Sequence, residues 1–353
     1  MKKIVFFLPA AVGGAERVSI NYSRLLDEDK FQKVFVLIGK DCKDIRKILP
    51  AHARTYEIHI NNINRWGIYR IIKILKKEKP DFTFSSMFWV NVRVLVAAKL
   101  LGIKAVVRNN ITLDRLQSWM KTIVKITYKF AYKIIVQQEE MYDEVASIMP
   151  SIKAKIIVIH NPFVREDIDS KKNAPNPFED KNVIKVLWVG RISQEKGQDV
   201  LIKAISQIQR NDVHLFLLGK YNVDSTYYKT LIELVIELNV KERIHFCGFD
   251  SNPYPWMNNC DCFVMPSRLE GLPNALVEAM YLKKPVVATK CIPIVSRMVK
   301  DGYNGYLVEP EDYQGMSKAI MRALELQDFD MTYKPSGKDT INKIFKEKEH
   351  VRN

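Results

Sequence analysis

Short runs of apolar residues alternate with amphipathic segments along the whole chain. The runs in the first half are IVFFL, VFVLI, FTFS, KAVV, KIIV and KIIVI, and those in the second half are VIKVLWV, HLFLL, RIHF, CFVM, PVVA and GYLV. They are rich in β-branched and aromatic residues and are apolar at consecutive positions, which is typical of strands buried on both faces of a parallel sheet. With helical segments between them, they predict an α/β fold with two doubly wound sheets.

The stretch from Asn161 to Asn182 interrupts this alternation. It holds three prolines among charged residues and therefore predicts a linker between two domains. We expect a first Rossmann-like domain at residues 1–162 and a second at residues 163–330, with residues 331–353 forming a helical tail that returns towards the first domain. Two such domains facing each other leave a cleft at the carboxyl ends of their strands, where ligands of such sheets bind.

The first residues, MKKIVFFLPAAVGGAERV, allow two interpretations. Two lysines, a short apolar run and small residues have the outline of a secretory signal peptide. The same letters predict a first strand at residues 4–8, a glycine turn and an amphipathic helix. We favour the strand, because cleavage would remove the beginning of the sheet. In that interpretation Gly13 and Gly14 allow a phosphate or a sugar to approach the backbone closely.

The amino-acid composition is that of a folded protein without a membrane span, a zinc site or a disulfide framework. The 353 residues are 47% hydrophobic and 27% charged, as in an ordinary folded protein, and none of the uncharged stretches approaches the roughly 18 residues that a membrane span needs. Five cysteines without paired histidines disfavour a zinc site or a disulfide framework. We therefore expect a cytoplasmic protein with reduced thiols and no metal or other cofactor.

The net charge of +15 lies in one half of the chain. Residues 1–165 contain 29 Lys and Arg against 14 Asp and Glu, whereas residues 166–353 contain 26 of each. A basic half joined to a neutral half predicts two different partners, and the partner of the basic half should be anionic and extended.

Two cations follow the first strand of the second half. In VGRISQEKGQD, at residues 189–199, Arg191 and Lys196 lie between that strand and the helix that begins near Gly197. Cations at the carboxyl end of a parallel strand are placed to bind a diphosphate through charge-assisted hydrogen bonds. Ordinary solvated loop charges are the alternative interpretation.

Two carboxylates follow a later strand. The segment PSRLEGLPNALVEAM, at residues 266–280, contains Glu270 in a loop and Glu278 on a helix that begins near Pro273. Glu270 is placed to accept hydrogen bonds from sugar hydroxyls, and Glu278 from two vicinal ribose hydroxyls, while the helix N-terminus favours a phosphate. Glu278 would otherwise be a solvated helix residue, but its apolar neighbours predict that both helix faces are largely covered.

Taken together, these segments resemble the family-four retaining glycosyltransferases of the GT-B fold. GGAER at 13–17, HNP at 160–162, VGRISQEKGQDVLIKAI, EGLPNALVEAM and DGYNGYLVEPED at 301–312 carry the resemblance, with seven residues between the two glutamates. The resemblance implies two Rossmann-like domains facing across a cleft and a nucleotide-diphospho-sugar donor, with UDP-sugar foremost. It also implies hexosyl transfer with retention and without a metal, to a glycan or lipid-linked glycan acceptor in polysaccharide biosynthesis.

The resemblance also assigns roles to single residues. Arg191, Lys196 and Glu270 would be the catalytic residues. The donor-binding residues would be Gly13, Gly14, Gly190, Arg191, Lys196, Glu270, Gly271, Leu272, Pro273, Asn274 and Glu278. Arg108 and Asn109, after the strand KAVV, are possible contacts of the acceptor or another part of the substrate.

Other chemistries fit the sequence less well. The acidic triplets at 27–29, 167–169 and 328–330 do not follow convincing strands, which disfavours a metal site of the DxD kind. A glycosidase needs two carboxylates facing each other across a sugar, and one loop with its following helix would not supply them. A GT-B-like sugar-nucleotide epimerase is the nearest enzyme alternative. A basic nucleic-acid-binding protein is the alternative from another class, although the basic half has no recognisable nucleic-acid motif, and we expect no nucleic-acid partner.

The basic half contains two amphipathic segments, at residues 64–80 and 118–133. In the second, Lys121, Lys125, Lys129 and Lys133 are spaced by four and predict a cationic stripe along one helix, beside an apolar side that includes Trp119. Such helices suit an anionic membrane surface, which predicts a peripheral protein on the inner face of the cell membrane. A soluble anionic acceptor, or simple solvation of the lysines, would explain the same pattern.

Overall fold

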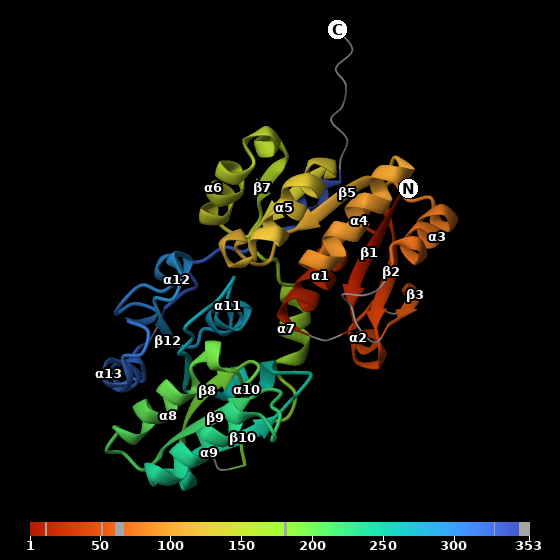
Figure 1. Cartoon of the computed structure of the whole chain (residues 1–353). Coiled ribbons are helices and arrows are strands. Elements are labelled where there is room, and N and C mark those ends of the chain that lie inside the picture. Colours follow the sequence, from red (N-terminus) through yellow and green to blue (C-terminus); the bar gives the residue numbers. More distant parts are fainter. Residues whose placement is uncertain (11–12, 51, 61–66, 180–181, 328, 346–353) are drawn as a thin grey trace. The chain divides into compact units, whose positions relative to one another are not determined.

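The computed structural model describes residues 1–10, 13–50, 52–60, 67–179, 182–327 and 329–345, which divide into two compact units (Figure 1). The first unit contains residues 1–164 together with the segment from 335 onwards, and the second contains residues 165–334. The sequence placed these boundaries at 162/163 and 330/331. Residues 346–353 of the expected tail lie outside the described residues.

The first unit is built on a parallel sheet with the strand order β3-β2-β1-β4-β5-β6-β7. Its strands are β1 (Lys2–Pro9), β2 (Phe31–Gly39), β3 (Arg54–His59), β4 (Phe82–Ser86), β5 (Lys104–Arg108), β6 (Lys133–Val136) and β7 (Ile156–Val158). Its α-helices are α1 (Gly14–Leu25), α2 (Lys43–Lys47), α3 (Tyr69–Glu78), α4 (Phe88–Leu101), α5 (Ser118–Thr127), α6 (Glu139–Ile148) and α14 (Lys338–Ile344). Short 3-10 turns are η1 (Leu113–Arg115), η2 (Tyr128–Phe130) and η3 (Pro150–Lys155).

The second unit repeats this plan with the strand order β10-β9-β8-β11-β12-β13, again all parallel. Its strands are β8 (Ile184–Val189), β9 (Val213–Leu218), β10 (Ile244–Gly248), β11 (Cys262–Met265), β12 (Val286–Thr289) and β13 (Gly305–Val308). Its helices are α7 (Arg165–Lys171), α8 (Gln198–Ser206), α9 (Thr226–Glu237), α10 (Tyr254–Asn259), α11 (Asn274–Tyr281), α12 (Pro293–Met298) and α13 (Tyr313–Ala323), with 3-10 turns η4 (Gln194–Lys196) and η5 (Lys241–Arg243). No helix in the described ranges combines the length and the apolar character that a membrane crossing requires.

The predicted fold class is confirmed, and the apolar runs identified in the sequence fall in strands. Alternate residues of one strand serve opposite faces of the first sheet. Ile4 and Phe6 pack in a cluster that includes residues of α1 and α14, whereas Val5 and Phe7 pack in a cluster that includes residues of α3 and α4. This two-sided burial explains why the run IVFFL has no polar alternation.

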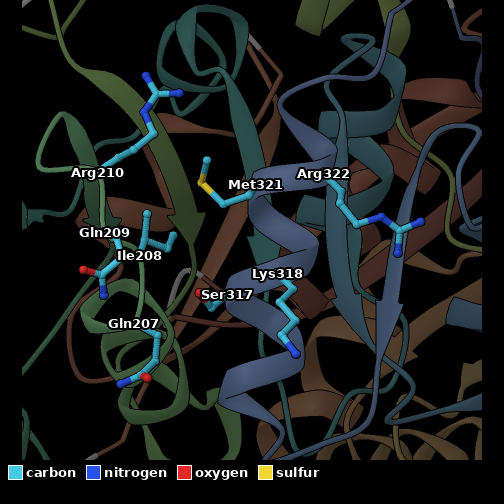
Figure 2. A pocket seen from close by; sticks show the side chains of 8 residues that line it. All are labelled: Gln207, Ile208, Gln209, Arg210, Ser317, Lys318, Met321 and Arg322. Atoms are coloured by element: carbon cyan, nitrogen blue, oxygen red, sulfur yellow. The ribbon is translucent and has the colours of Figure 1, made fainter.

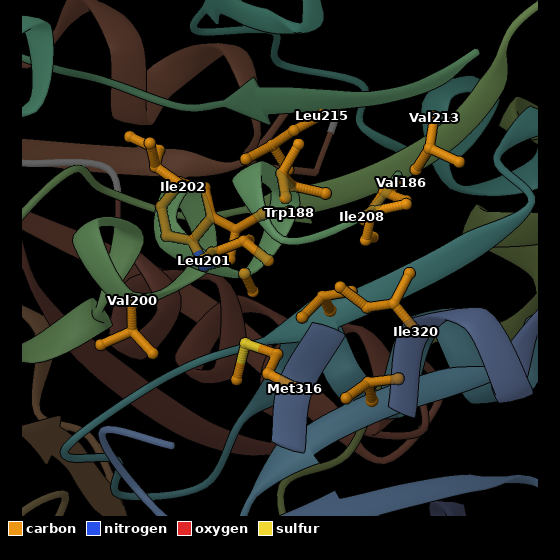
Figure 3. Packing of buried hydrophobic residues seen from close by; sticks show 14 of the residues in the cluster. Val186, Trp188, Val200, Leu201, Ile202, Ile208, Val213, Leu215, Met316 and Ile320 are labelled. Carbon is orange, nitrogen blue, oxygen red and sulfur yellow. The ribbon is translucent and has the colours of Figure 1, made fainter. Parts of the chain in front are cut away.

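The second unit has a continuous core beneath its sheet (Figure 3). Trp188 of β8, Leu201 of α8 and Ile320 of α13 are among its buried side chains. Burying each large apolar side chain contributes about 1.5–3 kcal/mol. This packing fixes β8 and α8, and therefore both ends of the loop that joins them.

The predicted linker is wrong in one part. Residues 165–171 form helix α7 of the second unit instead of an irregular connection. Its Ile168 is buried, and Tyr281 of α11 donates a hydrogen bond to Asp169 Oδ2 at 2.7 Å. The helix carries only one buried apolar residue, so periodicity did not reveal it.

The predicted cationic stripe is also wrong in part. Helix α5 ends at Thr127, Lys129 lies in the 3-10 turn η2, and Lys133 begins strand β6. Only Lys121 and Lys125 therefore share the helix. The β-branched residues after Lys133 form strand β6 between β5 and β7, so the four-residue spacing of the lysines does not continue as a helix. Residues 64–66 of the other basic segment lie outside the described residues.

Candidate active site

The site that the sequence predicted lies where the strand order of the second sheet reverses. Strand β8 pairs with β11, with Val186 opposite Cys262 and Leu187 opposite Phe263. We call residues 190–197 the β8 loop and residues 266–273 the β11 loop. Because parallel neighbours end at the same edge, the two loops lie beside each other although they are far apart in the sequence. The carboxyl edge at such a reversal is the usual ligand site of an open α/β sheet.

The backbones of the two loops touch at Gly197. This residue has φ +69°, and a Cβ added to it would lie 2.1 Å from the carbonyl oxygen of Pro266. Glycine is therefore required at this position both by the left-handed conformation and by the close approach. The contact explains why a glycine stands at the beginning of α8.

Lys196 and Glu270 form the central polar contact between the loops. The Lys196 Nζ donates to Glu270 Oε1 at 2.7 Å, and the Ser267 hydroxyl donates to the same oxygen at 2.8 Å. The side chains of Lys196 and Glu270 are 24% and 11% exposed. An ammonium has three N–H donors and a carboxylate has two oxygens, so this pair has capacity for a ligand in addition to its own contact. The role of Ser267 was not predicted, although its place three residues before Glu270 in the quoted motif could have indicated it.

Arg191 lies in the same β8 loop as Lys196. Its side chain is 74% exposed, and its Nη2 lies 3.5 Å from Glu195 Oε1. Its carbonyl oxygen accepts a hydrogen bond from the fully buried side chain of Gln198. Burial acts to raise the pKa of Glu195, but hydrogen bonds and the charges of Arg191 and Lys196 outweigh it and hold the pKa below its usual value. The loop thus presents a fixed backbone with an accessible guanidinium.

Helix α11 follows the β11 loop. Leu272 and Pro273 are buried, and Gly271 and Asn274 are half-buried at the beginning of the helix. Glu278 is half-buried between two buried neighbours on the same helix. The position of Glu278 between covered neighbours agrees with what NALVEAMYL indicated, while its assignment to ribose binding stays a prediction. Gly190 lies at the end of β8.

The predicted residues of the first unit occupy two environments. Gly13 and Gly14 are exposed at the beginning of α1. Arg108 is only 1% exposed and donates to Ser86 Oγ at 3.0 Å and to Asn161 Oδ1 at 2.6 Å. Burial lowers the pKa of Arg108 below its usual value, and its interactions with Tyr22 and Glu16 act in the opposite direction without outweighing it.

Asn109 is likewise buried, and its Oδ1 accepts a hydrogen bond from the Tyr128 hydroxyl at 3.3 Å. Arg108 and Asn109 therefore connect β5 to neighbouring segments of the first unit, and their contact with substrate stays a prediction.

One group of three side chains in the described part of the chain could supply metal ligands. The ligand atoms of Cys42, Glu57 and His59 lie within 4.8 Å of one another. Glu57 already accepts a hydrogen bond from Arg46 Nε at 2.7 Å, and its other oxygen lies 2.9 Å from His59 Nε2. An arginine on the same carboxylate opposes a second cation there. The group belongs to the first unit, whereas the β8 and β11 loops belong to the second.

A cavity of about 520 Å³ lies elsewhere in the second unit (Figure 2). Residues 207–210, which follow α8, form one side, and side chains of α13 that include Met321 form the other. Residues 207–210 lead into the amino end of β9, so the cavity is at the opposite edge of the sheet from the β8 and β11 loops. It is therefore not part of the candidate active site.

Two family models match the chain. The model described as Glycosyltransferase Family 4 matches residues 12–166, and the model described as Glycosyl transferases group 1 matches residues 167–340. An uncharacterized glycosyltransferase of Methanocaldococcus jannaschii is 29% identical over 63% of this chain, and the match spans 59% of that protein.

Two further relatives have names that state a reaction. The N-acetylgalactosamine-N,N'-diacetylbacillosaminyl-diphospho-undecaprenol 4-alpha-N-acetylgalactosaminyltransferase of Campylobacter jejuni is 27% identical over 62% of this chain and 58% of its own length. The UDP-Gal:alpha-D-GlcNAc-diphosphoundecaprenol alpha-1,3-galactosyltransferase of Escherichia coli is 25% identical over 89% of this chain and 85% of its own. The chain thus spans less than two thirds of the first two relatives and most of the third.

Solved structures share the fold over nearly the whole chain. The Anabaena protein HepE in complex with UDP and glucose has a TM-score of 0.78 and 21% identity, covering 97% of this chain and 98% of that one. The lipopolysaccharide outer core galactosyltransferase WaaB has a TM-score of 0.65 and 19% identity, covering 97% and 94%. This likeness shows the two-domain GT-B fold, and the two family models, which together match residues 12–340, show that the chain belongs to the family-four glycosyltransferases.

Proposed function

We propose that this protein is a retaining hexosyltransferase that uses a nucleotide-diphospho-sugar donor, with UDP-sugar as the first candidate. The acceptor would be a glycan or a lipid-linked glycan in surface polysaccharide biosynthesis. The observation that carries the proposal is the contact of Lys196 with Glu270 beside Arg191 at the carboxyl edge of the second sheet. The named reactions of the relatives and the UDP bound to HepE support the choice of donor and acceptor.

The two cations would act on the donor diphosphate. In the proposed reaction, the bond between the anomeric carbon and the diphosphate oxygen breaks, and its electron pair stays on the diphosphate. A bond forms from an acceptor hydroxyl to the same face of the sugar, and the hydroxyl proton passes to the departing diphosphate. Arg191 and Lys196 would stabilise the charge that develops on this leaving group, each charge-assisted contact contributing about 1.5–3 kcal/mol. No metal ion takes part in this proposed reaction.

The two glutamates would hold different parts of the donor. Glu270 is fixed by Lys196 and Ser267 and would accept hydrogen bonds from hydroxyls of the reacting sugar. Glu278 lies further along α11 and would accept from the ribose hydroxyls. The first turn of α11 would add the positive end of a helix dipole near the diphosphate. Gly13 and Gly14 would leave room beside the donor.

The basic first half would meet an anionic membrane surface on the cytoplasmic side. In helix α5, the Trp119 and Ile126 side chains are 49% and 56% exposed, and Lys125 is exposed beside them. Exposed aromatic and aliphatic groups next to lysines suit the interface of an acidic bilayer. The undecaprenol carriers in the names of two relatives support an acceptor held at a membrane.

A screen of nucleotide sugars against thermal unfolding tests the proposal. A donor that binds the folded protein raises the unfolding midpoint by mass action, and we expect the largest increase with a UDP-sugar in the presence of chelator. The best donor is then incubated with and without a lipid-linked acceptor. Transfer to the acceptor supports the proposal, whereas conversion of the donor sugar without transfer would indicate an epimerase. No increase with any nucleotide sugar would contradict both.

A further inference from the structure

Arg268 lies in the β11 loop, two residues before Glu270, and its guanidinium has a complete set of protein partners. Its Nη1 donates to Asp199 Oδ1 at 2.8 Å and to the Gln194 carbonyl at 2.7 Å. Its Nη2 donates to Asp199 Oδ2 at 2.7 Å and to Glu311 Oε2 at 2.9 Å, and its Nε donates to Glu311 Oε1. These five hydrogen bonds use the five N–H donors of a guanidinium, so Arg268 has no donor left for a substrate.

Two partners of Arg268 lie on either side of Lys196 in the chain. Gln194 precedes Lys196 in the turn η4, and Asp199 follows it in the first turn of α8. The backbone N–H groups of Arg268 and Leu269 both donate to the carbonyl oxygen of Glu195, at 2.9 and 3.2 Å. The chain on either side of Lys196 is thereby tied to the chain directly before Glu270.

We infer that Arg268 is a positioning residue: it joins the β8 loop to the β11 loop and so sets the geometry of Lys196 and Glu270. This inference rests on the proposed function for its effect on turnover, but the mechanical connection itself is independent of it. The ion pairs support the same role, because Asp199 and Glu311 both face the one permanently charged guanidinium and both depend on it for their cation.

Asp199 makes this connection strong. Burial acts to raise the pKa of Asp199, but hydrogen bonds from Arg268 and from the Tyr227 hydroxyl outweigh it and hold the pKa below its usual value. Tyr227 donates to Asp199 Oδ1 at 2.7 Å, which connects the pair to helix α9. Removing the guanidinium would leave a partly buried carboxylate without its cation, so the β8 loop would have to move.

Lysine can replace this arginine only in part. Its ammonium has three donors without the planar arrangement that serves two carboxylates and a carbonyl at once. The matched control is Arg210, which also forms a two-bond pair with an aspartate, Asp212, at 3.1 and 2.6 Å. That pair joins residues only two positions apart on the exposed surface and contacts neither loop of the site.

Hydrogen exchange of the protein without donor tests the connection directly. In Arg268→Met we expect the backbone amides of residues 194–197 and of Leu269 to exchange at least tenfold faster than in the parent. The control Arg210→Met should show no such change. The milder variant Glu311→Gln, which leaves the Asp199 pair in place, should change exchange in the same direction but less. If Arg268→Met does not fold, the exchange rates of Glu311→Gln test the inference instead. Unchanged exchange in both loops of a folded variant would overturn the inference, whatever the activity of the protein.

A kinetic comparison tests the consequence for the site. We expect Arg268→Met to lower kcat at least tenfold while donor KM changes less than threefold, Arg268→Lys to recover only part of the loss, and Arg210→Met to behave as the parent. In a Lys196→Gln background, Arg268→Met should lower kcat by a clearly smaller factor than in the parent, because one of the two groups that it positions is already gone. An equal loss in both backgrounds would assign Arg268 a general structural role and overturn the inference. If the parent turns over no donor, the proposed function fails and the exchange experiment still decides the connection.

Discussion

The Nζ of Lys196 lies 2.7 Å from Glu270 Oε1, although 74 positions separate the two residues in the chain. The reversal of strand order between β8 and β11 produces this meeting, since each residue lies in the loop that follows one of the two neighbouring strands. A cation and a carboxylate held together at this edge form the element on which the proposed donor site depends.

The two glutamates should differ in their kinetic effects. We expect Glu278→Ala to raise donor KM at least tenfold with a smaller effect on kcat, because it would remove contacts that the donor makes throughout the reaction. Glu270→Ala should instead lower kcat at saturating donor, because this residue would lie at the reacting sugar and also holds Lys196. Initial rates over a range of donor concentrations measure both. Identical binding defects in the two variants would reject this division.

The thiols should be unreactive in the native protein. Burial is the main cause that raises the pKa of Cys247 and Cys291 to about 11 and that of Cys260 to about 12. A raised pKa means less thiolate at neutral pH, so alkylation at pH 7.5 should be slow and should accelerate as the pH rises towards 10. Mass spectrometry of labelled peptides measures this, with urea-unfolded protein as the control that labels readily. Labelling of native Cys291 as fast as in the unfolded chain would contradict its half-buried setting and its raised pKa.

The C-terminal helix should stabilise the first unit. Phe345, at the end of α14, is 0% exposed, and its ring centroid lies 5.5 Å from that of Phe82 and 6.1 Å from that of Phe31. We expect Phe345→Ala to reduce the free energy of unfolding of this unit by about 3–5 kcal/mol through lost burial and a residual cavity. Urea unfolding measures the change, and Ile236→Ala, at an exposed position of α9, is the control, with an expected effect within about 0.5 kcal/mol. Equal midpoints for parent and Phe345→Ala would show that α14 is not a required part of the unit.

Binding to acidic vesicles should depend on the lysines near α5. If the basic half faces an anionic bilayer, binding should rise with acidic lipid and fall with salt, since screening reduces the reach of surface charge to about 8 Å at physiological ionic strength. Changing Lys121, Lys125 and Lys129 together to Gln should reduce binding at least tenfold, because each basic residue near the surface contributes about 1 kcal/mol. Co-sedimentation with vesicles measures this.

Turnover of the same triple variant on a short soluble acceptor should persist and serves as the control for folding. Undiminished binding of the variant to acidic vesicles would exclude this segment as the membrane contact.

The sequence predicted the strands that are apolar at consecutive positions and missed strand β3 and helix α7, which are not. The run IVFFL predicted β1 because both faces of the central strand are covered. Strand β3 was not predicted, because it lies at the edge of the sheet and Arg54 and His59 at its ends are exposed. Four-residue spacing predicted a helix through Lys133, but the neighbouring strands require residue 133 in β6.

The sequence could name those candidate residues whose chemical type and position within a short motif already indicate ligand binding. Arg191, Lys196 and Glu270 could be named from two short segments, because cations and carboxylates after parallel strands indicate a ligand site. Arg268 lies in the same motif as Glu270, but the sequence predicted no role for it, because its partner Asp199 is 69 positions away in the chain. Such a connection depends on which strands are neighbours, and the sequence pattern did not determine the strand order.

The most direct test of the account is a calorimetric titration of UDP, in the presence of chelator, into the parent protein and into variants of the two cations. We predict that the parent binds UDP, that Arg191→Ala and Lys196→Ala each weaken binding and lower turnover at least tenfold, and that all variants keep the parent's circular dichroism spectrum. Lys318→Ala, on the exposed side of α13, should bind as the parent does. Equal affinity and turnover in the parent and the two cation variants would contradict the proposed diphosphate site, as would a parent that binds neither UDP nor any other nucleoside diphosphate.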